Sequence, residues 1–146
     1  MYTYHYPRPA VSVDIILIQN QPVSPQILLI QRKSEPFQDM FALPGGFVGI
    51  DEPLKTAALR ELKEETGLEG IPLQQIYAFG APHRDPRGRV ISIAYGTLIE
   101  HNQSLHPRPA SDASSLGWFD LNHLPPLAFD HAQIIRKGAA VLQPSA

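Results

Sequence analysis

Residues 45–68, which read GGFVGIDEPLKTAALRELKEETGL, restrict the fold more than any other part of the chain. Their second half carries an apolar residue at every fourth position: Leu54, Ala58 and Leu62. This period predicts an amphipathic helix over residues 52–66. Asp51 is a candidate N-cap, Pro53 suits the first turn, and Gly67 can end the helix.

Three glutamates lie within about one turn of this predicted helix. Glu61 and Glu65 are four residues apart and Glu64 is three from Glu61, so all three share a face, opposite the apolar one. Like charges at these spacings cost a helix about 0.2–0.5 kcal/mol per pair. Either this face is solvated, with Arg60 and Lys63 reducing the repulsion, or it binds a cation.

The spacing around the glutamates decides between the two interpretations. Gly46, Glu52 and the helical residues match every fixed position of the pattern G-x5-E-x7-R-E-U-x-E-E-x-G-U, in which U is aliphatic. Average residue frequencies give a chance match a probability on the order of 10⁻⁹ per starting position. The pattern is the Nudix box, and the chain therefore resembles the Nudix hydrolases.

The resemblance implies a role for each residue of the box. In this family the motif binds divalent cations, usually magnesium, which hold the diphosphate of a nucleoside diphosphate linked to another group. The implied metal ligands are the Gly46 carbonyl and the carboxylates of Glu61, Glu64 and Glu65. Glu64 is either a further ligand or the residue that activates water, Glu52 supports the metal shell, and Arg60 orients a glutamate. The implied catalytic residues are Arg60, Glu61, Glu64 and Glu65.

The chemistry of these side chains favours the same kind of cation. A carboxylate face alone would repel a diphosphate, so metal ions must lie between them. Oxygen ligands and a sequence without cysteine favour Mg²⁺, or Mn²⁺ as its substitute, over zinc. Bound ions polarise phosphoryl oxygens and lower the pKa of an attacking water. They also relieve the repulsion among the glutamates.

The flanks of the box carry the substrate prediction. The segments YPRPAVSVD, LLIQRKSEPFQDMFALPGGFV, FGAPHRDPRGRVISIAY and LPPLAFDHAQII look like the ADP-ribose pyrophosphatase branch of the family. This resemblance implies hydrolysis of ADP-ribose to AMP and ribose 5-phosphate. The alternatives are another dinucleotide, a nucleotide sugar or an oxidised nucleoside triphosphate as substrate, or a module that senses ADP-ribose without cleaving it. A complete set of box glutamates favours the enzyme.

The loop HRDPRGR offers three arginines to such a substrate: Arg84, Arg87 and Arg89. Guanidinium groups suit phosphate geometrically, although a solvated turn is the alternative. We predict that Arg84 and Arg87 bind substrate, together with Arg32 at the end of an earlier strand. Tyr6 is a candidate for stacking on adenine, against the alternative that it packs or contacts a second subunit.

Four further residues leave alternatives open. Tyr4 and Phe37 are additional stacking candidates with the same alternative as Tyr6. Asp14 interrupts an apolar run, so it either faces polar neighbours or is buried and hydrogen-bonded. Glu100, at a strand end, is either a late carboxylate of the site or a solvated residue.

The order of the predicted elements indicates an α/β or α+β fold. Strands are predicted over residues 10–18, 26–33, 73–82, 89–100 and 117–121, and a second helix begins near residue 130. Residues 44–46 read as a Pro-Gly-Gly turn. The apolar stripe of the second helix is Ile134, Ile135, Val141 and Leu142, and Gly138 weakens its continuity. Together with the resemblance, this predicts one domain, residues 1–146, folded as a Nudix-type α/β/α sandwich with a central mixed sheet.

The composition restricts the classes of partner that we expect for this protein. A formal charge of −2 and basic runs no longer than two residues predict no nucleic-acid surface. Related transcriptional regulators add a C-terminal winged helix–turn–helix, for which we expect no room after residue 146. No signal peptide and no run of about 20 apolar residues is evident, so we expect no membrane association and a cytoplasmic protein. The expected partner is a small nucleotide, and the family resemblance suggests a homodimer with an exchanged N-terminal segment.

Overall fold

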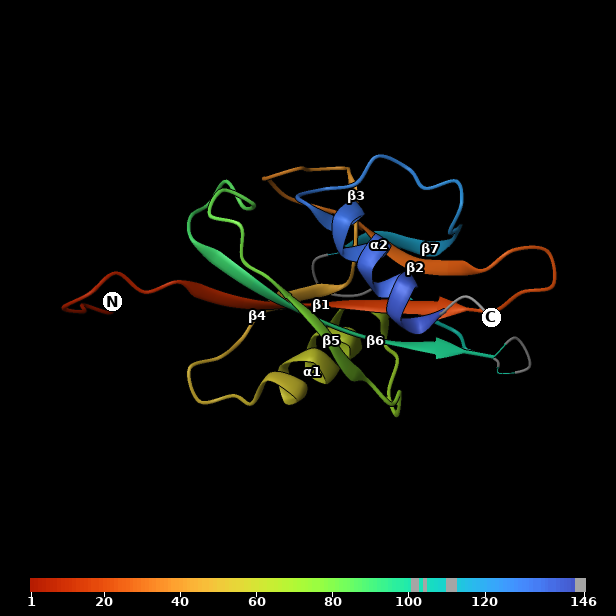
Figure 1. The fold of residues 1–146 in the computed structure, drawn as a ribbon, viewed down its shortest axis with the longest axis horizontal. Helices are drawn as coiled ribbons and strands as arrows, with labels where there is room; N and C mark the ends of the chain where they lie inside the picture. The colour runs from red at the N-terminus through yellow and green to blue at the C-terminus, as the bar shows by residue number, and fades with distance from the viewer. Residues whose placement is uncertain (101–102, 104, 110–112, 144–146) are drawn as a thin grey trace.

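The computed structural model describes residues 1–100, 103, 105–109 and 113–143. Its elements in chain order are β1 (Ala10–Gln19), β2 (Gln26–Arg32), β3 (Phe41–Ala42), β4 (Gly45–Phe47), α1 (Leu54–Thr66), β5 (Gln74–Phe79), β6 (Val90–Ile99), β7 (Ala113–Asp120) and α2 (His131–Leu142). Residues before β1 extend away from the body of the molecule (Figure 1). Within the residues that the structure describes, no helix is long and apolar enough to cross a membrane. The cytoplasmic location stays a prediction.

The strands form one mixed sheet in the order β3-β2-β1-β6-β5. β1 runs parallel to β6 along its whole length, whereas the other strand pairs are antiparallel. β1 and β2 pair only beside their connecting turn, through Ile18 with Ile27 and Gln19 with Gln26. Beyond that point β4 pairs with β1 and β3 pairs with β2, while β7 pairs with β2 along its length. The two long strands therefore separate, and a wedge opens between them.

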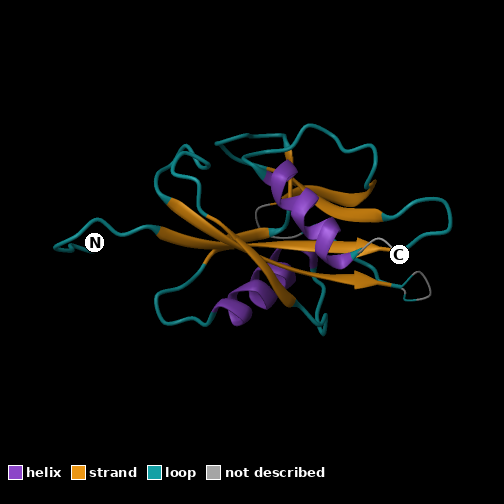
Figure 2. Cartoon of the chain, viewed as in Figure 1, coloured by secondary structure: helices purple, strands orange, loops and turns teal. Residues whose placement is uncertain are grey.

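Alternation along β1 builds two cores. Val13, Ile15 and Leu17 pack with Leu62 of α1, while Ile16 and Ile18 pack with α2. Successive side chains of a strand point to opposite faces, which is why one apolar run can serve both helices. Figure 2 shows the helices on the two sides of the sheet. The predicted α/β/α sandwich with a central mixed sheet is confirmed.

Helix α1 begins two residues later than its periodicity predicts. Pro53 is the N-cap, with extended backbone (ψ 148°), so Asp51 does not cap the helix. Glu52 precedes a proline, and that position disfavours helical dihedrals because the proline ring crowds the preceding residue. The predicted C-terminus is confirmed, since Gly67 adopts the left-handed conformation (φ 75°) and donates its N–H to the Lys63 carbonyl.

Three other local predictions need correction. The predicted glycine turn is strand β4, because the Gly45–Gly46 backbone pairs with β1. β7 begins at Ala113, four residues before the predicted strand, because it pairs with β2 along its length. Helix α2 runs unbroken through Gly138, whose missing side chain leaves room for Ile16. Val141 is 38% exposed and lies outside the buried stripe.

Candidate active site

A pocket of about 400 Å³ lies in the wedge where β1 and β2 separate. Its walls come from β1, β2, β4 and α1, and from the segments that precede β6 and α2. The charged and histidine side chains that line it are Asp14, Arg32, Lys33, Glu35, Glu61, Glu64, Glu65, Arg84, Asp85, Arg87 and His131. The pocket thus brings the box glutamates and three of the predicted arginines to one place.

Arg60 lies behind the glutamates and joins them. Its Nε is 2.6 Å from Glu52 Oε2, and its Nη1 is 2.8 Å from Glu61 Oε1 and 3.2 Å from Glu64 Oε2. Nη2 donates to the Phe47 carbonyl at 3.0 Å. The hydrogen bond from Arg60 lowers the pKa of Glu52 to about 2. Arg60 thus contacts Glu52 and two of the predicted metal ligands, and the roles of Arg60 and Glu52 stay predictions.

Glu61 lies against the backbone of Gly46. A Cβ on Gly46 would overlap the Glu61 carboxylate, so any side chain here would displace that carboxylate. The Glu61 side chain is 12% exposed. Burial raises its pKa above the usual value, although the Arg60 guanidinium opposes the shift. A carboxylate held in such surroundings gains from a nearby cation.

Glu65 differs from its sequence expectation. We expected the three carboxylates to share a face opposite the apolar stripe, yet Glu65 is 5% exposed, whereas the Glu64 side chain is 48% exposed. The cause is β4, which packs beside α1 and donates the Gly45 N–H to Glu65 Oε1 at 2.6 Å. The glutamates therefore lie at graded depths within the pocket wall.

The donor set fits a divalent cation in its chemistry. Carboxylate and carbonyl oxygens are the ligands that hard dications prefer. Within the described residues, no three acidic or histidine side chains converge into a ligand cluster. Glu61 and Glu64 instead contact Arg60, and Glu65 accepts from Gly45. To bind a cation, these carboxylates would have to rotate toward the pocket and give up their present hydrogen bonds.

The arginines of the HRDPRGR loop have different surroundings. Arg84 is paired with Asp130 through two contacts, Nη2–Oδ1 at 2.6 Å and Nε–Oδ2 at 2.9 Å, and its side chain is 3% exposed. Arg87 binds Asp85, and its side chain is 42% exposed. Arg89 donates to the Gly80 carbonyl and does not line the pocket. Arg87 is therefore the most accessible of the three toward a substrate in the pocket.

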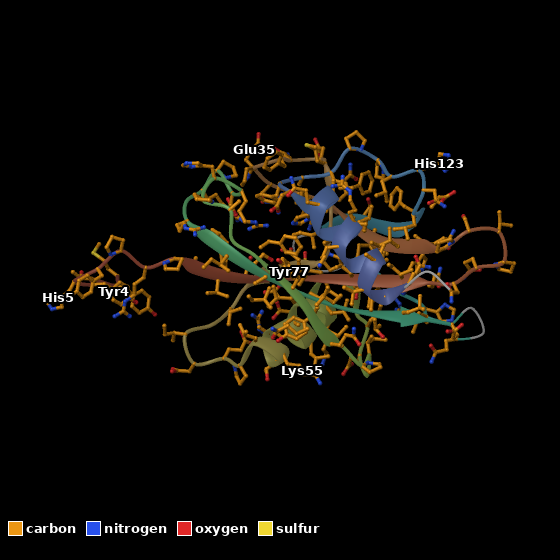
Figure 3. The ribbon with its side chains drawn as sticks, in the orientation of Figure 1. Tyr4, His5, Glu35, Lys55, Tyr77 and His123 are labelled. Atoms are coloured by element: carbon orange, nitrogen blue, oxygen red, sulfur yellow. The ribbon has the colours of Figure 1, made fainter. Side chains whose placement is uncertain are left out.

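Of the other two residues predicted to bind substrate, Arg32 lines the pocket and Tyr6 does not. Arg32 lines the pocket, donates to the Pro36 carbonyl at 2.7 Å and lies over the Phe129 ring. Tyr6 is 78% exposed on the N-terminal segment, and one chain by itself does not bring it to the pocket. Figure 3 shows Tyr4 on the same outlying segment. Phe37 packs edge-on against Phe129.

Sequence reasoning missed three residues of the site. Phe129, with a left-handed φ of 52°, lies beneath both Arg32 and Arg87. Positive φ in a bulky residue stores strain and concentrates at functional sites. Asp14 and His131 line the pocket as well, and both are buried. The sequence gives an indication of a role for Asp14, because it is the only charged residue in its strand. It gives no such indication for His131. Glu100 accepts from Asn20 and does not line the pocket.

A family model for the NUDIX domain matches residues 8–138. The match covers most of the chain and includes every residue of the box. The chain therefore belongs to the Nudix family, as its sequence predicts.

Known relatives place it more closely within that family. An ADP-ribose pyrophosphatase from Methanocaldococcus jannaschii is 44% identical over 131 residues, which cover 90% of this chain and 73% of that protein. The ADPR responsive transcriptional repressor NtrR from Acinetobacter baylyi is 35% identical, over 94% of this chain and 56% of the repressor. The NUDIX domain of Shewanella oneidensis NrtR, solved in complex with ADP ribose, superposes with a TM-score of 0.85 at 29% identity and covers 93% of this chain and 90% of that one.

Proposed function

We propose that this protein hydrolyses ADP-ribose to AMP and ribose 5-phosphate. The observation that carries the proposal is the complete box, three of whose glutamates line one pocket together with three arginines. The similarity to the pyrophosphatase of M. jannaschii supports the substrate. The reaction consumes one water, breaks the P–O–P bridge and leaves one phosphate on each product.

We further propose Mg²⁺ as the cation, with Mn²⁺ as its substitute. The Gly46 carbonyl and the carboxylates of Glu61, Glu64 and Glu65 would hold it. When bound, such an ion polarises the phosphoryl oxygens and lowers the pKa of the attacking water. Arg60 holds Glu61 and Glu64 in reach of the pocket through its two short contacts.

The basic side of the pocket serves to orient the substrate. The Arg87 guanidinium can leave Asp85 and turn toward a diphosphate. Asp85 would not lose all its partners, because it also accepts from the Arg87 backbone N–H at 2.9 Å. Charge-assisted bonds of this kind are stronger than neutral ones. Arg84 acts indirectly, since both of its contacts fix the residue before α2.

Sensing without cleavage is the second candidate. It is favoured by the similarity to an ADPR responsive repressor and to a NUDIX domain bound to ADP ribose. Such a module would bind ADP-ribose in the same pocket and release it unchanged. The complete box supports the hydrolase over this alternative.

A homodimer is proposed for the assembly. The segment before β1 extends away from the body of the molecule (Figure 1). It carries Tyr2 and Tyr6, which are 73% and 78% exposed. Apolar surface on a projecting segment is stabilised when a second copy covers it. Sedimentation of the full chain tests this point independently of activity.

The function is tested with a panel of substrates in the presence of MgCl₂. ADP-ribose, diadenosine polyphosphates, nucleotide sugars and oxidised nucleoside triphosphates are incubated separately, and the products are resolved by chromatography. We expect AMP and ribose 5-phosphate from ADP-ribose at the highest kcat/KM of the panel. Faster turnover of another nucleotide would reassign the substrate. ADP-ribose binding without any turnover across the panel would establish the sensor.

A further inference from the structure

A buried polar chain crosses the sheet beneath the pocket. Asp14 of β1 accepts a hydrogen bond from the Ser92 hydroxyl of β6. The other carboxylate oxygen of Asp14 lies 3.4 Å from Nε2 of His131, the first residue of α2. All three residues are less than 10% exposed. Buried polar groups of this kind are costly unless they are paired, so their arrangement is specific.

The hydrogen bonds of His131 define its tautomer. Nδ1 lies 3.0 Å from the backbone nitrogen of Leu43, which can only donate. Nδ1 must therefore accept, and the ring proton resides on Nε2, where it faces Asp14. The imidazole thus connects the backbone just before β4 with the carboxylate of β1.

The backbone between these attachments contacts both Glu61 and Glu65. Gly45 pairs with Asp14 in the sheet and donates its N–H to Glu65. Gly46 packs directly on the carboxylate of Glu61. A Cβ on Gly45 would overlap Val13 and Asp14, and a Cβ on Gly46 would overlap Glu61. No side chain anchors this backbone, so its position depends on the neighbouring residues.

We infer that His131 and Asp14 are positioning residues that fix residues 43–46 and, through that backbone, the cation ligands Glu61 and Glu65. The inference rests on the proposed function, because it assigns the glutamates a cation. His131 lines the pocket, but both of its ring nitrogens are engaged, Nδ1 by the Leu43 N–H and Nε2 by Asp14. A displaced glycine backbone would move the Gly46 carbonyl and loosen both carboxylates together.

Three substitutions of His131 separate its two contacts. H131N retains an acceptor near the position of Nδ1 and keeps the Leu43 contact. H131Q retains a donor near the position of Nε2 and keeps the Asp14 contact. H131A loses both. H123A is the control, since the His123 side chain is 82% exposed on the loop that follows β7 (Figure 3).

Mn²⁺ is the probe, and its binding is measured by electron paramagnetic resonance without substrate. We expect H131A to raise the Kd for Mn²⁺ about 10- to 100-fold, as changes behind metal ligands do elsewhere. H131N and H131Q should give smaller, intermediate shifts, and H123A none. The concentration of Mn²⁺ that half-saturates turnover should rise in parallel, while KM for ADP-ribose at saturating metal changes little.

Several outcomes overturn the inference. An unchanged Kd in folded H131A or, where that variant does not fold, in both H131N and H131Q, removes the positioning role. A wild type that binds no Mn²⁺ removes it too, because no ligand set would need positioning. A wild type that binds Mn²⁺ but cleaves nothing refutes the proposed function, while the Kd values still test the role of His131.

Discussion

Arg84 and Asp130 form a largely buried ion pair that joins the loop before β6 to the start of α2. The two contacts are 2.6 and 2.9 Å long and use two different guanidinium nitrogens. Such a pair holds its partners in one geometry, because a planar fork meets a planar carboxylate. The pair explains how residues far apart in sequence build one wall of the pocket.

Arg84→Ala should therefore destabilise the fold. Removing one partner of a buried pair leaves the other charge without compensation and typically costs about 3–5 kcal/mol. Urea unfolding of the variant and the wild type measures the difference. Arg89→Ala is the matched control, because Arg89 is exposed and its guanidinium donates to the Gly80 carbonyl and not to a carboxylate among the described residues. An Arg84 variant as stable as the wild type would show that Asp130 is readily solvated.

Arg87→Ala should act mainly on substrate use, and it should cost less stability than Arg84→Ala, because the backbone N–H of residue 87 still donates to Asp85. Its guanidinium is partly exposed, and losing one charge-assisted bond of about 1.5–3 kcal/mol lowers kcat/KM for ADP-ribose roughly 10- to 100-fold. Kinetics on ADP-ribose and on a diadenosine polyphosphate are compared. Equal losses would mean that the residue serves the shared phosphates, whereas no loss on either substrate would leave this loop without a binding role.

Glu65→Gln should leave the fold intact and lower kcat by at least about 10²–10³-fold. The amide can still accept the Gly45 N–H but brings no charge to a cation. Circular dichroism verifies the fold, and initial rates at saturating Mg²⁺ verify the loss. Turnover near the wild-type value under those conditions would contradict the metal role of this residue.

The box residues could be predicted from the sequence because their relationships are local. Glu61, Glu64 and Arg60 lie on one helical turn, so their spacing alone places them together. The burial of Glu65 depends on β4, 20 residues earlier, and no helical period reveals it. His131 meets Leu43 across 88 residues, and Arg84 meets Asp130 across 46. Such partners depend on how strands and helices pack, which a single sequence does not display.

The stability of the protein should fall as the pH drops below about 6.5, in part because of His131. Burial lowers the pKa of this imidazole, even though Asp14 and Asp130 lie near it. Below the unfolded value of about 6.5 the unfolded chain binds a proton that the folded chain excludes, at up to about 1.4 kcal/mol per pH unit. Urea unfolding at pH 7.5, 6.5 and 5.5 should show a smaller decline for H131N, and parallel declines would contradict the assignment.

Gly138→Ala should destabilise the protein, although alanine is the better helix former by roughly 1 kcal/mol. Gly138 lies in the middle of α2 and is buried against β1. A Cβ at this position would overlap the Cδ1 of Ile16 and crowd its Cγ1 and Cγ2 at 3.2 Å, and this side chain is itself fully buried. Overpacking of this kind costs about 1–3 kcal/mol, which exceeds the gain in helix propensity.

Thermal unfolding of G138A should therefore give a lower Tm than the wild type, while Gln133→Ala, on the exposed face of the same helix, should give an unchanged or higher one. I16V combined with G138A removes the Cδ1 methyl and should recover part of the loss. A G138A variant with a raised Tm would show that α2 moves away from the sheet at little cost.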